Sequence, residues 1–255
     1  MYQQLFSLEG KTIIVTGASS GLGRGLSLAY AKAGANIVAA SRNISKLEEL
    51  VQEIVEPGRK ALSVKTDVTK SSDVDNLIKV TLDTFGGIDV LFNCAGMSIP
   101  GLLAEHVSEK EMQTIMDTNL KGTFLCGTAV ARYMLDRGKG KIINMSSVLG
   151  KTTWAKASIY CVSKASIDQM TKAWATEWAP RNVTVNALAP TFIITGMNRH
   201  LFANKDYEDR VLGHLPMGRF GTVEDLIGPA IFLASSASDF MTGHILVVDG
   251  GWTCV

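Results

Sequence analysis

The chain lacks the residue patterns that mark several common protein classes. Its 255 residues contain four cysteines without Cys-x-x-Cys spacing and four histidines without the spacing of metal ligands. So few thiols indicate a reducing compartment, in which they act as small apolar fillers rather than as a disulfide framework. We therefore expect a cytoplasmic protein without a metal site.

Charge excess and long apolar runs are also missing. The 25 basic and 24 acidic residues give a net charge of +1, which offers no attraction for nucleic acid or an anionic membrane. No apolar stretch approaches the roughly 18–20 residues of a membrane span. Residues 1–10 lack the basic region and apolar core of a signal peptide. We expect a small-molecule substrate, with neither nucleic acid nor a membrane as a partner.

No repeat and no linker rich in proline or serine divides the chain, so we expect a single domain over 1–255. Short β-branched runs that predict strands alternate with longer helical patterns. The predicted strands are 11–17, 36–40, 61–66, 88–93, 141–146, 182–188 and 245–249. The predicted helices are about 21–33, 44–55, 71–85, 108–137, 157–179 and 223–235. This alternation predicts an α/β fold, a Rossmann-type doubly wound parallel sheet with helices on both faces.

One long segment, about 189–222, fits neither pattern. It contains Pro190, Pro216 and four glycines, and it follows the sixth predicted strand. A loop longer than about 12–15 residues in a compact domain is usually functional. Because ligands bind outside the carboxyl ends of parallel strands, we interpret this segment as a substrate lid.

A glycine-rich turn joins the first predicted strand to the first predicted helix. It carries Gly17, Gly21 and Gly23 in the spacing Gly-x-x-x-Gly-x-Gly. Between a strand and a helix, such a turn lets backbone N–H groups at the helix N-terminus hold a pyrophosphate. The sequence therefore predicts a dinucleotide site here, with an ordinary strand–helix turn as the alternative.

Tyr160 and Lys164 lie four residues apart in a predicted helix, so their side chains share a helix face. A free tyrosine titrates near about 10, and a neighbouring ammonium favours the phenolate. We predict that Lys164 lowers the pKa of Tyr160 and makes the phenol a proton donor and acceptor near neutral pH. Taken alone, the pair is also typical of a solvated helix surface.

With these two features, further motifs resemble the short-chain dehydrogenase/reductase family. The matching segments run from residue 11 to residue 252 and include Thr16 to Gly23, Asn93-Cys94-Ala95-Gly96, Asn119, Ile143 to Ser147, Tyr160 with Lys164, and Asp249-Gly250-Gly251-Trp252. The run from Met217 to Ser238 is similar to that of bacterial gluconate 5-dehydrogenases and related sugar-acid enzymes.

The resemblance implies a catalytic set, namely Asn119, Ser147, Tyr160 and Lys164. Tyr160 would transfer a proton to or from the substrate oxygen, and Ser147 would donate a hydrogen bond to that oxygen. Lys164 would bind the nicotinamide ribose, and Asn119 would hold a water that relays protons, with a structural role as the alternative. Ser147 lies thirteen residues before Tyr160, the family's usual spacing, which favours it over Ser146.

The end of the second predicted strand bears on the choice of cofactor. An NAD site has a carboxylate there for the ribose 2′-hydroxyl, whereas this chain has Ser41, Arg42 and Asn43. A hydroxyl and a guanidinium suit a 2′-phosphate, which favours NADP(H), although an Arg42 that turns to solvent would also allow NAD(H). The candidate cofactor-binding residues are Gly17, Ser19, Ser20, Gly21, Leu22, Gly23, Ser41, Arg42, Asn43, Asp67, Val68, Asn93, Ala95, Gly96, Tyr160, Lys164, Pro190, Ile193 and Thr195.

Two positions depart from the family's pattern. Cys94 replaces the second asparagine of Asn-Asn-Ala-Gly, a segment with a mainly structural role in the family, so we expect little change in chemistry. Thr191 stands where the family usually has Pro-Gly, and that glycine lets the backbone pass the nicotinamide. This second departure puts the backbone geometry of the lid in question.

We expect an enzyme that interconverts a secondary alcohol and a ketone by hydride transfer, on a sugar acid, a polyol or another small polar carbonyl compound. A 3-oxoacyl-(acyl-carrier-protein) reductase is the alternative. It would hold its acidic partner on the basic residues Arg137, Lys139, Lys141, Lys172 and Arg181. A non-catalytic dinucleotide-binding sensor or scaffold is an alternative of another class.

The segment between the serine and the tyrosine must line the substrate pocket if both residues reach one oxygen. Lys151 and Lys156 are candidates for a substrate carboxylate, with solvated surface charges as the alternative. Trp154 is a candidate for stacking on a sugar ring or for packing under the lid.

The resemblance also implies a homotetramer. The predicted helices 108–137 and 157–179 would pair across one interface, and the tail from Asp249 to Val255 would lie at another. Burial against a neighbouring subunit would explain the apolar Trp252 and Val255 at a chain end, where termini normally fray.

Overall fold

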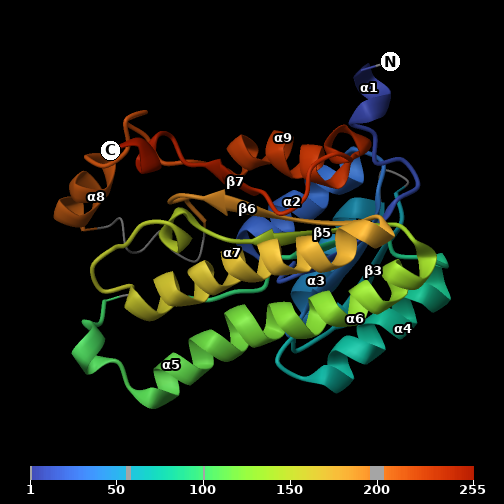
Figure 1. Ribbon diagram of the computed structural model, residues 1–255, viewed down its shortest axis with the longest axis horizontal. Coiled ribbons are helices and arrows are strands. Elements are labelled where there is room, and N and C mark those ends of the chain that lie inside the picture. Colours follow the sequence, from blue (N-terminus) through green and yellow to red (C-terminus); the bar gives the residue numbers. More distant parts are fainter. Residues whose placement is uncertain (1, 56–58, 100, 196–203) are drawn as a thin grey trace.

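The computed structural model describes residues 2–55, 59–99, 101–195 and 204–255 (Figure 1). Seven strands pair in parallel in one sheet, in the order β3-β2-β1-β4-β5-β6-β7. The strands are β1 (Thr12–Thr16), β2 (Asn36–Ser41), β3 (Ala61–Lys65), β4 (Val90–Asn93), β5 (Gly140–Met145), β6 (Val183–Pro190) and β7 (Ile245–Val248). The predicted doubly wound parallel sheet is confirmed, with every predicted strand in place.

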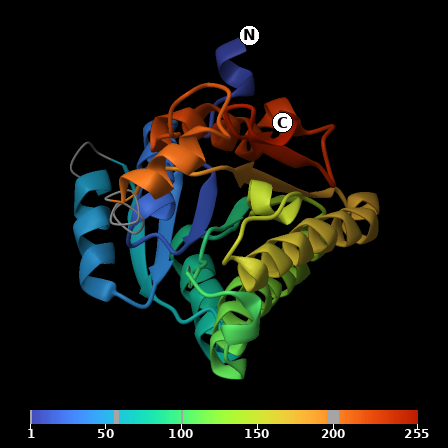
Figure 2. The same ribbon diagram turned by 90° about the vertical axis from the view of Figure 1, so that its left-hand side faces the viewer.

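Helices cover both faces of the sheet. They are α1 (Tyr2–Leu5), α2 (Gly21–Lys32), α3 (Ile44–Val55), α4 (Ser71–Phe85), α5 (Glu109–Met116), α6 (Gly122–Arg137), α7 (Ser158–Trp178), α8 (Lys205–Leu212) and α9 (Val223–Ala234). One core cluster joins the sheet to α2, α3 and α9, and another joins it to α4, α6 and α7. The two helical layers are seen in Figure 2.

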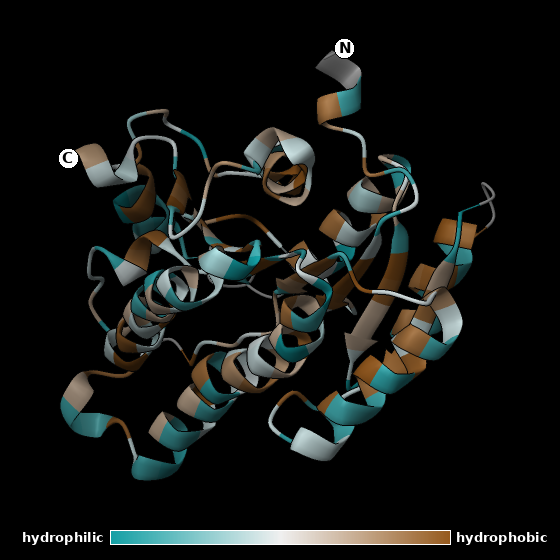
Figure 3. Cartoon of the chain, turned by 45° about the vertical axis from the view of Figure 1, so that its right-hand side comes forward, coloured by the Kyte–Doolittle hydropathy of each residue, from teal (hydrophilic) through white to brown (hydrophobic). Residues whose placement is uncertain are grey.

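Alternation along the strands divides the core between these two clusters. Successive side chains of a strand point to opposite faces of a sheet, so Ile13 and Val15 of β1 enter the first cluster and Ile14 enters the second. All three are fully buried. Figure 3 shows the resulting distribution, with hydrophobic residues on the central strands and hydrophilic residues on the outward turns of the helices.

The predicted helix 108–137 is present without a gap from residue 109, but it is not α-helical along its whole length. It divides into α5 and α6 at a π-helical turn over Asp117–Lys121, and a capping box of Ser108 and Glu111 begins α5. Asn119 sits in this turn and is buried. The wider turn rotates the residues that follow it, which is how a π-turn directs a side chain inward at a functional site.

The predicted lid is more ordered than the sequence suggested. β6 extends to Pro190, Ile193 pairs with Gly221 in an isolated parallel bridge, and α8 forms within the segment. The signals for α8 were present: Asn204 caps it by accepting a hydrogen bond from the Tyr207 N–H at 3.1 Å, and acidic residues occupy its first turn. The part of the predicted lid at 196–203 lies outside the described residues.

Chain order and sheet order diverge between β1 and β4. These strands are neighbours in the sheet, although β2 and β3 separate them along the chain. At such a switch point the loops after the two strands part and leave a crevice at their carboxyl ends. The start of α7 and helix α8, within the predicted lid, lie at this edge of the sheet (Figures 1 and 2). Over the described residues, no helix is both long and apolar enough to cross a membrane.

Candidate active site

The glycine-rich turn after β1 is packed at backbone distance. A Cβ on Gly17 would lie 2.8 Å from the Cα of Ala95, and one on Gly23 would collide with the Gly17 carbonyl oxygen. Gly17 and Gly21 also have positive φ angles of 71° and 53°. Side chains at these positions would therefore disrupt the turn that the sequence predicted to hold a pyrophosphate.

The open end of this turn meets the start of the lid. Ser20 is the N-cap of α2, but its side chain makes no capping hydrogen bond, so the first N–H groups of α2 keep their capacity to bind an anion. A Cβ on Gly21 would lie 3.6 Å from the side chain of Thr195. Thr195 therefore lies beside the turn, and its contact with a cofactor stays a prediction.

At the end of β2, two of the three predicted side chains make local hydrogen bonds, whereas Arg42 makes no ion pair among the described residues. The Ser41 hydroxyl accepts a hydrogen bond from the Asn43 N–H at 3.2 Å, and the Asn43 side chain accepts one from Lys46 at the start of α3. Arg42 is exposed and has no carboxylate partner among the described residues. Arg24, the other cation near the turn, pairs with Glu53. The available guanidinium and N–H groups fit a phosphorylated dinucleotide.

Asp67 and Val68 follow β3 at the same edge of the sheet. Burial raises the pKa of Asp67, but hydrogen bonds from Thr69, with Lys70 and Arg42 nearby, outweigh it and hold that pKa below its ordinary value. The Val68 side chain packs on Gly122 at the start of α6, where a Cβ would lie 2.6 Å from it. Asp67, a candidate cofactor-binding residue, is thus an ionised group at this edge of the sheet.

The residues after β4 and β6 close the back of the crevice. Thr16 accepts hydrogen bonds from the N–H groups of Cys94 and Ala95 at 3.1 Å, and a Cβ on Gly96 would lie 3.6 Å from the Lys164 ammonium. The Asn93 Oδ1 and the Thr191 hydroxyl are buried without a hydrogen-bond partner among the described residues. Such groups suit the polar edge of a cofactor.

Thr191 does not distort the lid. Among the described residues, only Lys156 and Asn182 combine a side chain with a positive φ. The chain therefore leaves Pro190, at the buried end of β6, without needing the glycine that the family usually has here. The bridge of Ile193 to Gly221 fixes the next residues, because a Cβ on Gly221 would collide with the Ile193 side chain.

Tyr160 and Lys164 both point into the molecule rather than to solvent. Lys164 is 4% exposed, and its ammonium lies 5.6 Å from the centre of the Tyr160 ring. It donates a hydrogen bond of 2.7 Å to the Met145 carbonyl at the end of β5. The alternative of a solvated surface pair is excluded.

The pKa of Tyr160 differs from the prediction, which was that Lys164 would lower it. Burial raises the pKa of Tyr160 to about 12, with a hydrogen bond to Ser147 acting in the opposite direction. Burial lowers the pKa of Lys164 to about 8, against the influence of Cys94 and Asp168. Desolvation is therefore the main cause of the pKa shift of each group. The free protein therefore holds a neutral phenol beside an ammonium near neutral pH, the correct state for donating a proton.

The two serines after β5 face different partners. Ser147 is hydrogen-bonded to Tyr160, and its hydroxyl also accepts from the Leu149 N–H at 3.2 Å. Ser146 instead donates to the carboxylate of Asp168. The structure thus places Ser147, and not Ser146, beside the tyrosine.

Asn119 is held by its neighbours. Its side-chain oxygen accepts from the Met97 N–H at 2.8 Å, and its amide donates to the Met97 carbonyl at 2.9 Å and to Ser163 at 3.0 Å. The side chain thereby joins the loop after β4 to α7. Sequence reasoning missed Ser163, although its place between Tyr160 and Lys164 was visible. A water held by Asn119 stays a prediction.

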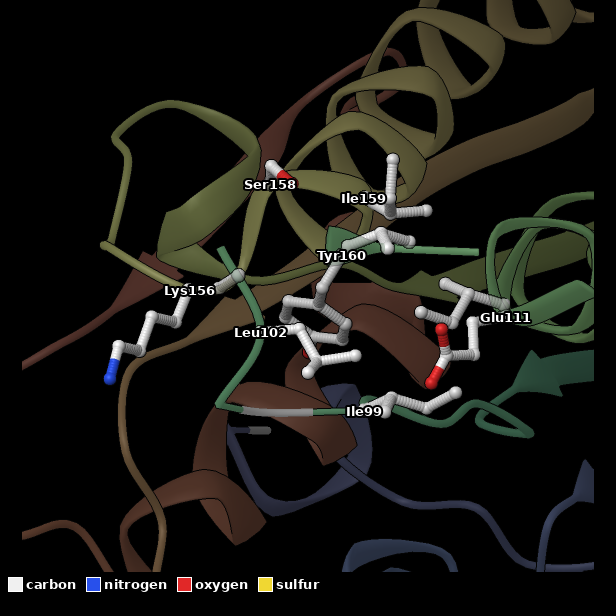
Figure 4. A pocket seen from close by; sticks show the side chains of 10 residues that line it. Ile99, Leu102, Glu111, Lys156, Ser158, Ile159 and Tyr160 are labelled. Carbon is white, nitrogen blue, oxygen red and sulfur yellow. The ribbon is translucent and has the colours of Figure 1, made fainter. Parts of the chain in front are cut away.

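A pocket opens beside Tyr160, between the segment after β4, the start of α5 and the start of α7 (Figure 4). It is mostly apolar, and its lining includes Ile99, Leu102, Val107, Ile115 and Ile159. The Lys156 ammonium extends away from Tyr160 (Figure 4), and Lys151 is exposed. Neither lysine therefore points at the tyrosine as a carboxylate ligand would.

Trp154 packs under the lid. Its ring lies 5.1 Å from His214, 5.1 Å from Trp252 and 6.0 Å from Phe192, centre to centre. The Arg210 guanidinium of α8 covers it at 5.0 Å. Trp154 and Tyr160 both pack on the apolar cluster that holds Trp252. The second alternative for Trp154 is the one that the structure supports.

Trp252 does not need a second subunit for its burial. It is 4% exposed within its own chain and donates a hydrogen bond to Thr152 at 3.3 Å. Asp249 folds the tail back by accepting from the Gly251 and Thr253 N–H groups. Val255 is 82% exposed. The expectation for Trp252 is therefore wrong, because the lid and the loop after β5 supply its neighbours.

This sheet, its glycine-rich turn and the pair of Tyr160 with a buried Lys164 define a dinucleotide-dependent oxidoreductase. A family profile described as enoyl-(acyl carrier protein) reductase matches residues 17–253. The chain belongs to the short-chain dehydrogenase/reductase family, as its motifs predicted.

Characterised relatives align over almost the entire chain. The 2-dehydro-3-deoxy-D-gluconate 5-dehydrogenase of Escherichia coli is 38% identical and aligns over 99% of both chains. The gluconate 5-dehydrogenase of Gluconobacter oxydans is 37% identical over 99% of this chain and 98% of its own. The structure of a Burkholderia cenocepacia gluconate 5-dehydrogenase in complex with NADP and tartrate superposes with a TM-score of 0.96, at 35% identity and full coverage of both chains.

Proposed function

We propose that this protein is an NADP(H)-dependent oxidoreductase that interconverts a secondary alcohol and a ketone on a sugar acid. The observation that carries this proposal is the group of Ser147, Tyr160 and Lys164 at the carboxyl edge of the sheet, beside an anion-binding turn; Ser147 and Lys164 are buried and Tyr160 is partly buried. The names of the sugar-acid dehydrogenases that align over the full chain support the substrate class.

The three side chains divide the acid–base work. The bound cofactor supplies or accepts the hydride. In the direction of reduction, Tyr160 donates its proton to the substrate oxygen while Ser147 donates a hydrogen bond to it. The Lys164 ammonium stabilises the phenolate that results and holds the ribose hydroxyls. Asn119 keeps α7 and the loop after β4 in register.

A preference for NADP(H) follows from the end of β2. Arg42 has no carboxylate partner among the described residues, and no acidic residue occupies 41–43 to repel a 2′-phosphate. The NADP bound to the Burkholderia cenocepacia enzyme supports the same choice. NAD(H) would lack the 2′-phosphate contact and bind more weakly.

A carboxylate on the substrate is better placed to bind a residue of the lid than Lys151 or Lys156. Arg210 stacks on Trp154 at 5.0 Å and on Tyr207 at 5.4 Å, and it makes no ion pair with a described carboxylate. The neighbouring acids Glu208 and Asp209 pair with Lys205 instead. We propose that the lid closes the site over the substrate within a single domain and presents this guanidinium to the acid group.

The carrier-protein alternative is disfavoured by the position of its basic residues. Lys139 and Lys141 flank the amino end of β5, and Arg181 precedes β6, so these cations lie at the edge of the sheet opposite the site. Two are already paired: Arg137 with Asp89 at 2.9 Å, and Lys141 with Asp239 at 2.8 Å.

The assembly and the location of the protein complete the proposal. Phe124 on α6 and Val162 on α7 are 47% and 53% exposed, and these apolar side chains suit the helix pairing of a homotetramer. All four cysteines are free thiols, which is compatible with the cytoplasm. Light scattering at micromolar concentration tests the tetramer, and a monomer would contradict it.

A substrate panel followed by NADPH absorbance tests the reaction. We expect reduction of 5-ketogluconate to exceed that of an acetoacetyl thioester, and Arg210→Leu to raise KM for the acid without affecting a neutral polyol. A thioester kcat/KM about tenfold higher, lost when Lys172 and Arg181 are changed to Glu, would favour the carrier-protein reductase. Cofactor binding without turnover on any ketone would favour the sensor.

A further inference from the structure

A buried carboxylate lies one turn beyond Lys164 on α7 and takes no part in the chemistry above. Asp168 is 6% exposed, and one of its oxygens accepts a hydrogen bond from the Ser146 hydroxyl. Burying a charge is costly unless other groups compensate it. Asp168 therefore occupies a position at which a carboxylate needs a structural or functional reason.

Three cations surround this carboxylate. Burial raises the pKa of Asp168, whereas the Ser146 hydrogen bond and the ammonium groups of Lys151, Lys172 and Lys164 act in the opposite direction. Lys172 and Lys164 belong to α7, and Lys151 follows the 3₁₀ turn Val148–Gly150. These charges favour the ionised form of Asp168, but burial is the larger influence and keeps the pKa above its ordinary value.

The other groups that face Lys164 cannot replace this carboxylate. Tyr160 lies on the same helix, and burial keeps its phenol neutral. Cys94, after β4, is the remaining titratable group, and burial raises the pKa of its thiol to about 12. Asp168 is thus the carboxylate that opposes the desolvation of the Lys164 ammonium.

Close packing joins the carboxylate to the catalytic loop. A Cβ on Gly150 would lie 2.9 Å from the second Asp168 oxygen and 3.0 Å from the Lys164 carbonyl. The turn after Ser147 therefore rests directly on α7 at this point. Water has little access to the carboxylate, which strengthens its interactions with neighbouring charges.

We propose that Asp168 is a positioning residue that fixes the end of β5 against α7 through Ser146 and keeps Lys164 charged. Ser146 lies between the Met145 carbonyl, which accepts from Lys164, and Ser147, which bonds to Tyr160. Holding Ser146 therefore sets both catalytic contacts at once. The proposal rests on the roles proposed for Ser147, Tyr160 and Lys164.

The charge of Lys164 can be measured without any substrate. Protein labelled with ¹³C at lysine Cε is titrated by NMR, and the Lys164 signal is the one lost in Lys164→Met. We expect Asp168→Asn to lower the Lys164 pKa by about one unit, because an opposite charge is removed. Ser146→Ala keeps that charge and should leave the pKa in place, as should the control Glu177→Gln, an exposed carboxylate on the same helix.

Kinetics then separate the two roles. In Asp168→Asn the alkaline limb of kcat/KM for ketone reduction should move to lower pH by the same amount. Ser146→Ala should lower kcat about tenfold, while the alkaline limb of the kcat/KM profile stays at the same pH. A folded Asp168→Asn protein with an unchanged Lys164 titration would overturn the electrostatic role. A Ser146→Ala enzyme with wild-type kcat would overturn the positioning role, and it remains decisive if Asp168→Asn fails to fold.

Discussion

The cofactor end and the substrate end of the cleft differ in how their segments pack together. At the cofactor end, the backbone of the turn after β1 packs directly on the backbone after β4. A Cβ on Gly17 would lie 2.8 Å from the Cα of Ala95. At the substrate end, large side chains meet: Trp154 and Trp252 are 5.1 Å apart, and Phe192 lies 5.3 Å from Trp252. A close backbone approach requires glycines at fixed spacing, which is a local pattern. An aromatic cluster assembles from segments about a hundred residues apart.

Helix α7 stands between these ends and carries the tyrosine that serves both. Tyr160→Phe should lose about 10²–10⁴-fold in turnover, because it removes only the transferable proton. The ring and its packing on the Trp252 cluster remain, so the dissociation constant for NADPH, measured by fluorescence, should stay within a factor of about two. An equal loss of rate and cofactor affinity would instead identify a structural tyrosine.

The substrate end should be the one that depends on side-chain volume. Trp252→Ala should cost about 3–5 kcal/mol of unfolding free energy, the usual range for a buried tryptophan. It should raise KM for the ketone more than it affects NADPH affinity, since its contacts lie under the lid. Urea unfolding and steady-state kinetics measure both effects. Val255→Ala, at an exposed end of the same tail, is the control and should change neither.

The cofactor end should depend on one charge. Arg42→Ala should weaken NADPH binding by about 10–150-fold, the value of a charge-assisted hydrogen bond of roughly 1.5–3 kcal/mol. NADH has no 2′-phosphate and should bind with little change. Lys46→Ala provides the matched control, because Lys46 is also an exposed cation and lies close by, in the first turn of α3. Similar losses for the two cofactors would refute the assignment of Arg42.

The smallest effect is expected at Lys156, on the substrate side. Its φ of 65° places a side chain in the left-handed region, at a cost of about 1–2 kcal/mol. Lys156→Gly should therefore raise unfolding free energy by up to about 1 kcal/mol while KM for a sugar acid stays the same, in contrast to Arg210→Leu. An increase in KM for the acid would restore Lys156 as its ligand.

The sequence predicted the sheet and the class of enzyme because both are local in origin. Short β-branched runs predict the strands, as in Ile13, Ile14 and Val15, whose side chains enter both core clusters, and glycine spacing predicts the turn before α2. The family's motifs then located Tyr160 and Lys164 on one face of α7. The sequence also carried the signals for α8, because Asn204 and the acidic residues that follow it are typical of a helix N-terminus.

Only the tertiary structure shows which residues that are distant in the sequence contact each other. Spacing along the chain favoured Ser147 over Ser146, but the partner that each serine contacts, Tyr160 or Asp168 on α7, is visible only in the folded chain. The sequence predicted that Lys164 lowers the Tyr160 pKa, but burial raises that pKa, and burial depends on distant segments that exclude water. A one-dimensional pattern records spacing within a helix or turn, whereas desolvation and long-range partners exist only once the chain has folded.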